Sequence, residues 1–285
     1  AYGPGRFKEI GKFCKNFKIN NALIVTDSGS INLPFISDLQ NLLNDSKIKS
    51  DIYSNISPNP RDDEIDSGCK KFREGNHDAI IAIGGGSAMD GGKAISLTVN
   101  SGVPLWDFEF EKEPPKLTME NPFPKIITIP TTAGTGAETE VTAMVTHLEK
   151  GMKFCLWHPD ARPCLALVDP ELTLKLPANL TAWTGIDAMI HAIEGYSVPM
   201  FHPLCDGSAL ESLNLISKSL KLAVNEPDNL VARGGMIIGS YLGGIAFLKG
   251  LGLVHAISHM VGAEYNTHHG LCLLYTSDAA DEIVR

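Results

Sequence analysis

Several features that would point to other classes of protein are missing from this chain. The six cysteines are widely scattered, with no CxxC motif and no paired spacing, which fits reduced thiols better than a disulfide framework. Acidic residues outnumber basic ones, and the net charge of −9 argues against nucleic acid or an anionic membrane as the main partner. The first residues do not have the charged and apolar segments of a secretory signal. We therefore expect a cytoplasmic protein.

A continuous apolar run long enough to suggest a membrane span is also missing. The most apolar stretch, residues 239–262, is interrupted by Lys249, His255, His259 and several glycines. Such a stretch is more typical of a buried core helix or helix pair than of a membrane-spanning helix. A length of 285 residues with 44% apolar content is enough for two domains, each with its own core.

The first part of the chain alternates between strands and helices. Apolar runs bounded by turn residues predict strands at 21–27, 50–56, 78–86, 124–130 and 165–170. The segments between them have helical periodicity, which implies right-handed βαβ units and a parallel sheet. From Ala178 onward the apolar positions repeat at helical spacing only. We expect an α/β domain over residues 1–177 and an all-α domain over residues 178–272.

A glycine-rich turn, GGGSAMDGGK at residues 84–93, lies where a predicted strand passes into a helix. Gly85 and Gly86 would let the backbone approach a ligand, and the helix N-terminus could hold a pyrophosphate. Ser87 could instead cap the helix, with Asp90 three residues later, so cofactor binding and a tight structural turn stay equally open. The helix also contains Gly91 and Gly92, which close packing against a bound group would explain.

A second loop of small polar residues, PTTAGTGAETE at residues 130–140, also follows a strand. Two such loops at strand ends of one sheet suggest a ligand crevice. The alternative is another strand-to-helix turn with a threonine cap. The loop offers the hydroxyls of Thr131, Thr132 and Thr135.

The helical half contains a set of residues suited to a metal ion. Asp187 and His191 are four residues apart, so on a helix they share one face, and His255 and His259 repeat this spacing. His269 supplies a further imidazole. A lone histidine on an apolar helix is usually a satisfied core residue. One carboxylate and three imidazoles, from Asp187, His191, His255 and His269, can instead enclose a divalent metal such as Fe²⁺ or Zn²⁺.

With these motifs in place, the chain resembles the iron-containing alcohol dehydrogenases from about Gly3 to Leu271. The motifs that carry the resemblance are GGGSAMD, PTTAGTGAE, GIDAMIHAIE and GLVHAISHMVGAEYNTHHG. The resemblance implies a Rossmann-like dinucleotide domain and a helical metal domain, with the active site in the cleft between them. It also implies hydride transfer between a small primary alcohol, or its aldehyde, and NAD(H), most often with Fe²⁺ and otherwise with Zn²⁺.

The resemblance assigns roles to individual residues. Asp187, His191, His255 and His269 would bind the metal, and His259 would lie beside it as a proton relay. Asp27, at the end of the first strand, would bind the adenosine ribose and disfavour NADP(H). The remaining cofactor contacts would come from Asn59, Gly85, Gly86, Ser87, Asp90, Thr131, Thr132, Thr135 and Lys153.

The sequence also departs from the family pattern. The resemblance stops after Cys272, and residues 273–285 look like a non-native tail, so we expect an incomplete helical domain with exposed apolar faces. A fragment with weak or no activity is the first alternative. A related metal and NAD enzyme of the dehydroquinate synthase or glycerol dehydrogenase type is the second. The resemblance suggests a homo-oligomer for the full-length protein and does not fix which alcohol is the substrate.

Overall fold

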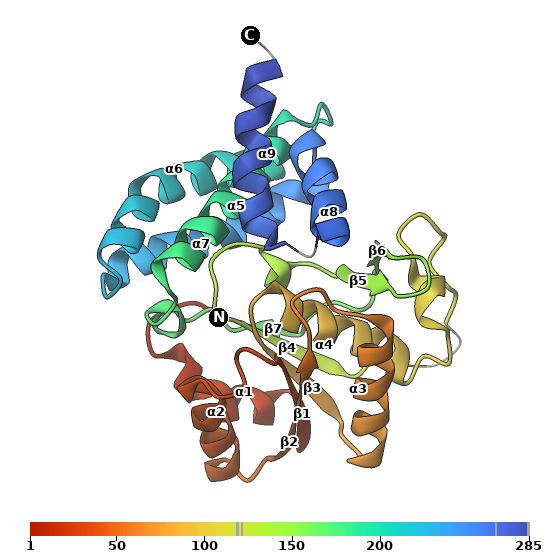
Figure 1. The fold of residues 1–285 in the computed structure, drawn as a ribbon. Helices are drawn as coiled ribbons and strands as arrows, with labels where there is room; N and C mark the ends of the chain where they lie inside the picture. The colour runs from red at the N-terminus through yellow and green to blue at the C-terminus, as the bar shows by residue number, and fades with distance from the viewer. Residues whose placement is uncertain (118–119, 121, 266, 284–285) are drawn as a thin grey trace. The chain divides into compact units, whose positions relative to one another are not determined.

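The computed structural model describes residues 1–117, 120, 122–265 and 267–283. The chain forms two compact units (Figure 1). The first contains residues 1–130 and 141–169, and the second contains residues 131–140 and 170–285. The contacts therefore place the loop 131–140 with the helical unit, whereas the sequence analysis placed every residue up to 177 in the α/β domain.

The first unit contains a five-stranded parallel sheet with the strand order β2-β1-β3-β4-β7. The central strands are apolar almost throughout, and every residue of β3 is buried, as expected for a parallel sheet covered on both faces. Figure 1 shows α1 and α2 on one side of this sheet and α3 and α4 on the other. The five strands predicted from the sequence are confirmed, and their bounds are β1 (Asn21–Asp27), β2 (Lys49–Ile56), β3 (Ala79–Gly84), β4 (Lys125–Pro130) and β7 (Leu165–Ala166).

The helices of this unit follow the βαβ pattern. They are α1 (Ile10–Asn16), α2 (Pro34–Asp45), α3 (Asp62–Glu74) and α4 (Gly86–Val99). The sequence analysis did not predict the antiparallel hairpin of β5 (Ala143–His147) and β6 (Met152–Leu156), which turns at Gly151 with a φ of 62°. Short 3-10 helices across the chain are η1 (Arg6–Glu9), η2 (Leu105–Phe108), η3 (Ala137–Thr139), η4 (Pro170–Thr173) and η5 (Phe247–Lys249).

The second unit is helical, and its described residues contain no strand, as the sequence predicted. Its helices are α5 (Ala178–Ser197), α6 (Pro203–Asn225), α7 (Leu230–Ala246), α8 (Leu253–Tyr265) and α9 (His269–Ile283). Three glycines at i, i+4 and i+8 of α7 lie close to neighbouring helices. An added Cβ at Gly235 would lie 2.1 Å from Ser219, and one at Gly239 would lie 2.6 Å from Ile216. At Gly243 it would lie 3.1 Å from the carbonyl of Ala188. These glycines let α7 pack tightly against α5 and α6.

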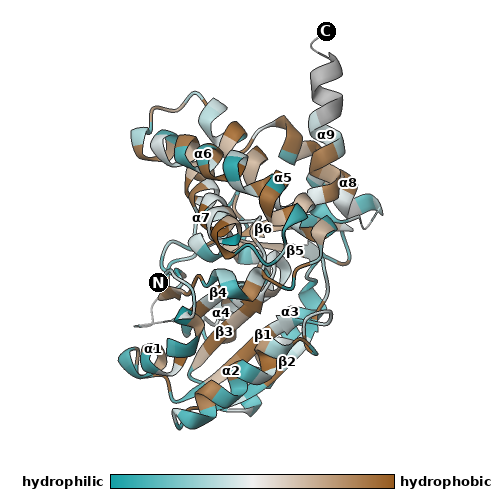
Figure 2. Ribbon diagram, turned by 90° about the vertical axis from the view of Figure 1, so that its left-hand side faces the viewer, coloured by the Kyte–Doolittle hydropathy of each residue, from teal (hydrophilic) through white to brown (hydrophobic). Residues whose placement is uncertain are grey.

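One described helix, Leu230–Lys249, is long and apolar enough to cross a membrane by length and composition alone, and 56% of its apolar window is buried inside the protein. This burial is typical of a core helix, which is what the sequence predicted for this apolar stretch. Large apolar side chains are nevertheless exposed on the second unit, which was also expected. They include Phe201, Leu204, Leu253, Met260 and Tyr265. Figure 2 shows the apolar strands of the first unit in brown between its helices.

The two glycines inside α4 have a structural role, which corrects the interpretation that they pack against a bound group. An added Cβ at Gly91 would lie 2.7 Å from the side chain of Ile56 on β2, and one at Gly92 would lie 2.7 Å from the Cβ of Ala82 on β3. Both contacts are shorter than van der Waals distance. The glycines therefore allow the helix to lie directly on the sheet.

We predict that Gly92→Ala destabilises the protein by about 1–3 kcal/mol, because overpacking outweighs the better helix propensity of alanine. Gly207→Ala is the matched control, since Gly207 is an exposed glycine of α6 with nothing within 4 Å of an added Cβ. That control should stabilise the protein by up to about 1 kcal/mol. Urea denaturation measures both changes, and a stabilised Gly92→Ala variant would contradict the packing role.

Candidate metal centre

Helix α5 positions the first part of the site. It begins after Pro177 and ends before Pro199, because proline removes a backbone donor and restricts the residue before it. Asp187, His191 and Glu194 stand at i, i+4 and i+7, so they share one face of this helix. All three side chains are buried. A row of buried polar groups in an apolar helix needs partners from other elements.

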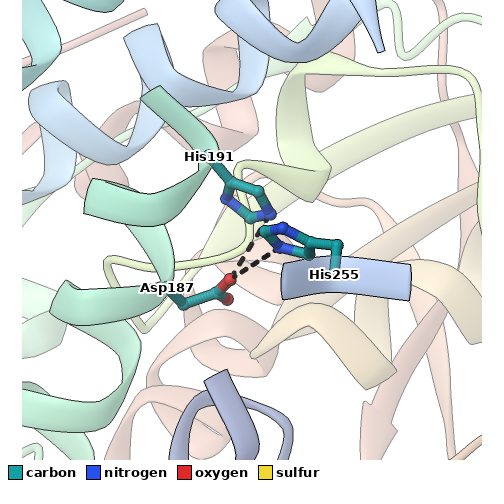
Figure 3. A group of neighbouring side chains, drawn as sticks. All are labelled: Asp187, His191 and His255. Atoms are coloured by element: carbon teal, nitrogen blue, oxygen red, sulfur yellow. Dashed lines mark ion pairs between the residues drawn. The ribbon is translucent and has the colours of Figure 1, made fainter. Parts of the chain in front are cut away.

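Those partners come from α8 and α9. The Oδ1 atom of Asp187 lies 3.3 Å from His191 Nε2, 3.5 Å from His255 Nε2 and 3.7 Å from His269 Nε2. Figure 3 shows the first three side chains pointing toward one another from α5 and α8. Ligands of a tetrahedral site with bonds of about 2.0–2.1 Å are about 3.3–3.4 Å apart. The spacing therefore matches neighbouring ligands of one metal ion.

The atoms facing this point are not satisfied by the protein. Asp187 Oδ1 and His255 Nε2 are buried, and within the described part of the chain neither has a hydrogen-bond partner. Leaving a buried polar atom unpaired costs about 1–3 kcal/mol, and more for a charged group. This observation argues against satisfied core histidines, and a divalent cation fits the donor set.

The ligand atoms of Asp187, His191 and His255 all lie within 4.8 Å of one another. His269 is outside that tight group, and its side chain is 27% exposed against 6% for His191. The structure thus brings the other three predicted ligands around Asp187 Oδ1, and His269 is the most exposed of them.

The electrostatics of the cluster put two of the ligands in the protonation state that a metal requires. Burial lowers the pKa of His191 to about 4, against the opposing charge of Asp187, so its imidazole is neutral at pH 7. Burial raises the pKa of Asp187, but the imidazoles of His191, His269 and His255 outweigh burial and hold this pKa well below its usual range. Asp187 is therefore ionised.

His255 differs from these two ligands. Burial lowers its pKa, but the carboxylates of Asp187 and Glu194 outweigh burial and raise it to about 9. A metal must therefore displace a proton from this imidazole at neutral pH.

Glu194 was not among the site residues predicted from the sequence. Its Oε2 lies 2.5 Å from His255 Nδ1, and its Oε1 accepts a hydrogen bond of 2.7 Å from the Val254 amide. The signal that could have identified it is the spacing of seven residues from Asp187 on the same helix face.

Two further histidines, His259 and His268, are close in sequence to the predicted ligands. The ring of His259 is 5.8 Å from that of His255 and 4.9 Å from that of His269, so it lies beside the predicted ligands without joining their tight group. His268 is exposed, and its ring lies 5.1 Å from that of Trp183.

The predicted cofactor residues of the first unit gather at one edge of its sheet. The chain moves from β1 to β2 on one side and returns through β3 on the other. The gap beyond the ends of β1 and β3 is therefore the switch point, where doubly wound sheets bind ligands. Asp27 ends β1, and an added Cβ at Gly84, which ends β3 with a φ of 146°, would lie 3.0 Å from Asp27 Oδ2. The glycine turn and Asp27 are direct neighbours.

Several of these residues form hydrogen bonds with other groups of the chain. Asp27 accepts hydrogen bonds from the Gly29 and Ser30 amides and from the Ser30 hydroxyl. Ser87 does not cap α4, because the N-cap is Gly85; its hydroxyl donates to the Pro58 carbonyl at 2.6 Å. The alternative in which Ser87 caps the helix is therefore wrong, since the helix starts at Gly86.

Side chains next to this turn form a charged group. Lys153 Nζ donates to Asn59 Oδ1 at 2.5 Å, and Lys93 Nζ lies 3.3 Å from Asp90 Oδ1. Burial raises the pKa of Asp90, with Lys93 opposing. Gly85 is the N-cap of α4, and Gly86 is its first residue.

The threonine loop belongs to the second unit. Added Cβ atoms at Gly134 and Gly136 would lie 2.6 Å from Thr184 of α5 and 2.7 Å from Gly244 of α7. These glycines therefore serve helix packing. Thr131 is buried, Thr132 is half-buried, and Thr135 Oγ1 accepts from the Ala137 amide at 3.3 Å.

Comparisons with known proteins find similar sequences over nearly the whole chain. The family model of iron-containing alcohol dehydrogenases matches residues 1–170, and the model of the family's C-terminal domain matches residues 181–277. The NAD-dependent methanol dehydrogenase of Bacillus methanolicus is 36% identical over 271 residues, which cover 95% of this chain and 70% of the relative. The 1,3-propanediol dehydrogenase of Klebsiella pneumoniae is 34% identical, with 95% and 69% covered.

Solved structures show the same likeness. An alcohol dehydrogenase from Oenococcus oeni superposes with a TM-score of 0.90 at 33% identity, covering 96% of this chain and 71% of that one. Sulfoacetaldehyde reductase from Bifidobacterium kashiwanohense, in complex with NAD⁺, has a TM-score of 0.88 at 31% identity, with 99% and 73% covered.

We predict that the metal-free chain binds one Zn²⁺ or Co²⁺ and that binding at pH 7 releases about one proton per ion from His255, because an imidazole ligand must be neutral. Affinity should rise about tenfold per pH unit from pH 7 and level off near the His255 pKa of about 9. Calorimetry in buffers of different ionisation enthalpy measures both. Affinity that is independent of pH, or the absence of binding, would contradict the site.

Proposed function

The chain belongs to the iron-containing alcohol dehydrogenase family, and we propose that Asp187, His191, His255 and His269 hold its metal ion. The enzyme is an NAD-dependent oxidoreductase. The observation that carries the assignment of the ligands is the approach of three imidazole nitrogens to one buried and otherwise unpaired carboxylate oxygen.

The donor set suits the reaction of the family. A divalent metal here supplies the Lewis acidity that lowers the pKa of an alcohol hydroxyl, and NAD⁺ accepts the hydride. Imidazole and carboxylate ligands suit Fe²⁺ and also Zn²⁺, and we propose Fe²⁺ on the family assignment. Asp187 contributes a single negative charge, so the ligand set leaves net positive charge facing the substrate oxygen. Asp187, His191 and His255 are buried in the helical unit.

We assign proton transfer to His259. Its ring lies 4.9 Å from that of His269, at the rim of the cluster, and it is half-buried. An imidazole in this place can take the hydroxyl proton, directly or through one water, and release it to solvent.

The proposed substrate is a small primary alcohol, or its aldehyde in the reverse direction. Relatives at 32–36% identity are named for methanol, 1,3-propanediol and choline, which all carry a primary hydroxyl. A lyase acting on a phosphorylated polyol would need free basic residues near the metal. Lys249 of the helical unit is instead buried, and its Nζ bonds to Asp206 Oδ1 at 2.5 Å and to the Tyr196 carbonyl. This arrangement favours the alcohol over the phosphorylated substrate.

We propose that Asp27 sets a preference for NAD(H) over NADP(H). It lies at the switch point beside Gly84, where a carboxylate can accept hydrogen bonds from a ribose 2′-hydroxyl and repel a 2′-phosphate. We also propose a cytoplasmic location and assembly into a homo-oligomer. The six free thiols support the first, and the exposed apolar side chains of the second unit support the second.

The direct test is alcohol-dependent formation of NADH by the Fe²⁺-loaded chain with methanol, 1-propanol or 1,3-propanediol. We expect Asp187→Asn to lower the rate by more than the about 10–100-fold that is typical of changes outside the ligand shell. Glu211→Gln is the control, since Glu211 is an exposed carboxylate of α6, and its rate should be unchanged. Turnover that persists in Asp187→Asn, or no turnover with metal bound, would contradict the proposal.

A further inference from the structure

We propose that Glu194 is a positioning residue that fixes the tautomer and orientation of His255, so that the Nε2 lone pair of His255 faces the metal. The inference rests on the proposed metal site. His255 Nδ1 lies 2.5 Å from Glu194 Oε2. An ionised carboxylate only accepts hydrogen bonds, so the proton of the neutral imidazole must be on Nδ1. The opposite nitrogen, 3.5 Å from Asp187 Oδ1, is then free to bind a metal.

The other oxygen of the same carboxylate fixes where Glu194 lies. Oε1 accepts a hydrogen bond of 2.7 Å from the amide of Val254, in the first turn of α8. The carboxylate is only 9% exposed. An added Cβ at Gly252 would lie 2.6 Å from Oε1, so the glycine before α8 leaves the space that this oxygen occupies. Glu194 therefore links the N-terminus of α8 to the histidine one residue further along.

Both contacts require an acceptor, and this requirement makes glutamate specific here. Both the Val254 N–H and the His255 Nδ1–H donate. A glutamine has one acceptor and one donor at its end. If its oxygen faces Val254, its NH₂ group faces Nδ1 and drives the imidazole proton to Nε2, which blocks metal binding. If its oxygen faces Nδ1, its NH₂ group faces the backbone N–H of Val254, and two donors then meet without an acceptor.

The structural alternative is that Glu194 only caps α8, as carboxylates do at helix N-termini. A cap would affect the free energy of unfolding without changing the ligand field of a metal. Glu64 offers a comparison within the same chain. It is as buried as Glu194, at 8% exposure each, and its Oε2 accepts from the Arg61 and Ser57 amides at the start of α3. It belongs to the first unit, whereas all four proposed metal ligands belong to the second.

The test is Co²⁺ binding to the full chain, with affinity measured by chelator competition and geometry by the visible absorption of Co²⁺. Glu194→Gln should bind Co²⁺ about 10–100-fold more weakly and with an altered spectrum. Glu64→Gln should lower the thermal stability of the metal-free chain and leave Co²⁺ affinity and spectrum as in the wild type. A Glu194→Gln variant that binds Co²⁺ with the wild-type affinity and spectrum would overturn the proposal.

Gly252→Ala gives a second measurement if Glu194→Gln does not fold. It keeps the carboxylate but pushes Oε1 away from its place, so Co²⁺ affinity should again fall; unchanged affinity with a displaced Glu194 would overturn the proposal. Failure of the metal site itself looks different. In that case wild type and Asp187→Asn would both fail to bind Co²⁺, whereas failure of the Glu194 role alone leaves wild-type binding intact and Asp187→Asn deficient.

Discussion

A buried, ionised carboxylate is the constraint around which the helical unit is organised. Asp187 is 2% exposed, and its Oδ1 faces three imidazole nitrogens without a hydrogen bond in the described part of the chain. Taking a carboxylate out of water costs several kcal/mol unless a charge or hydrogen bonds offset it. In the metal-free chain the protonated imidazole of His255 offsets part of this cost, and a bound divalent cation replaces that charge. The metal thereby stabilises the fold of the same unit whose chemistry it supplies.

The packing of the helices places this carboxylate deep in the core. An added Cβ at Gly243 of α7 would lie 3.5 Å from the Cβ of His191, and one at Gly195 of α5 would lie 2.9 Å from the Ala246 backbone. The ring of His191 lies 4.7 Å from the ring of Phe247 and is stacked on the ring of His255 at 4.5 Å. Small residues bring the helices together, and aromatic rings restrict the ligand side chains. Ligand side chains that are restricted in this way lose less entropy when they bind a metal.

Much of this arrangement could be predicted from the sequence, because it depends on local patterns. Strands of the parallel sheet are apolar runs bounded by turns, and Asp187 and His191 share a face through helical periodicity alone. Features that depend on distant contacts were less accessible. Gly91 and Gly92 are explained by Ile56 and Ala82, which no local pattern links to them.

Glu194 was missed for the same reason. A glutamate in an apolar helix resembles a solvated residue until α8 brings Val254 and His255 against it. The strands β5 and β6 are short, and beyond each other they pair with Arg61 and Glu109 only through isolated bridges in the described part of the chain, so the hairpin offers little hydrophobic pattern. The position of the threonine loop against α5 and α7 likewise follows from glycine contacts across the second unit.

The central claim is that one carboxylate and three imidazoles bind a single metal ion. X-ray absorption spectroscopy of the Zn²⁺-loaded chain tests it most directly, because imidazole rings give multiple-scattering signals and sulfur ligands lie at longer distance. The account predicts a shell of nitrogen and oxygen atoms at about 2.0–2.1 Å with the scattering of three imidazoles, and no sulfur at about 2.3 Å. Cys272 is the thiol nearest in sequence to His269. A sulfur shell, or a metal with fewer than three imidazoles, would contradict the account.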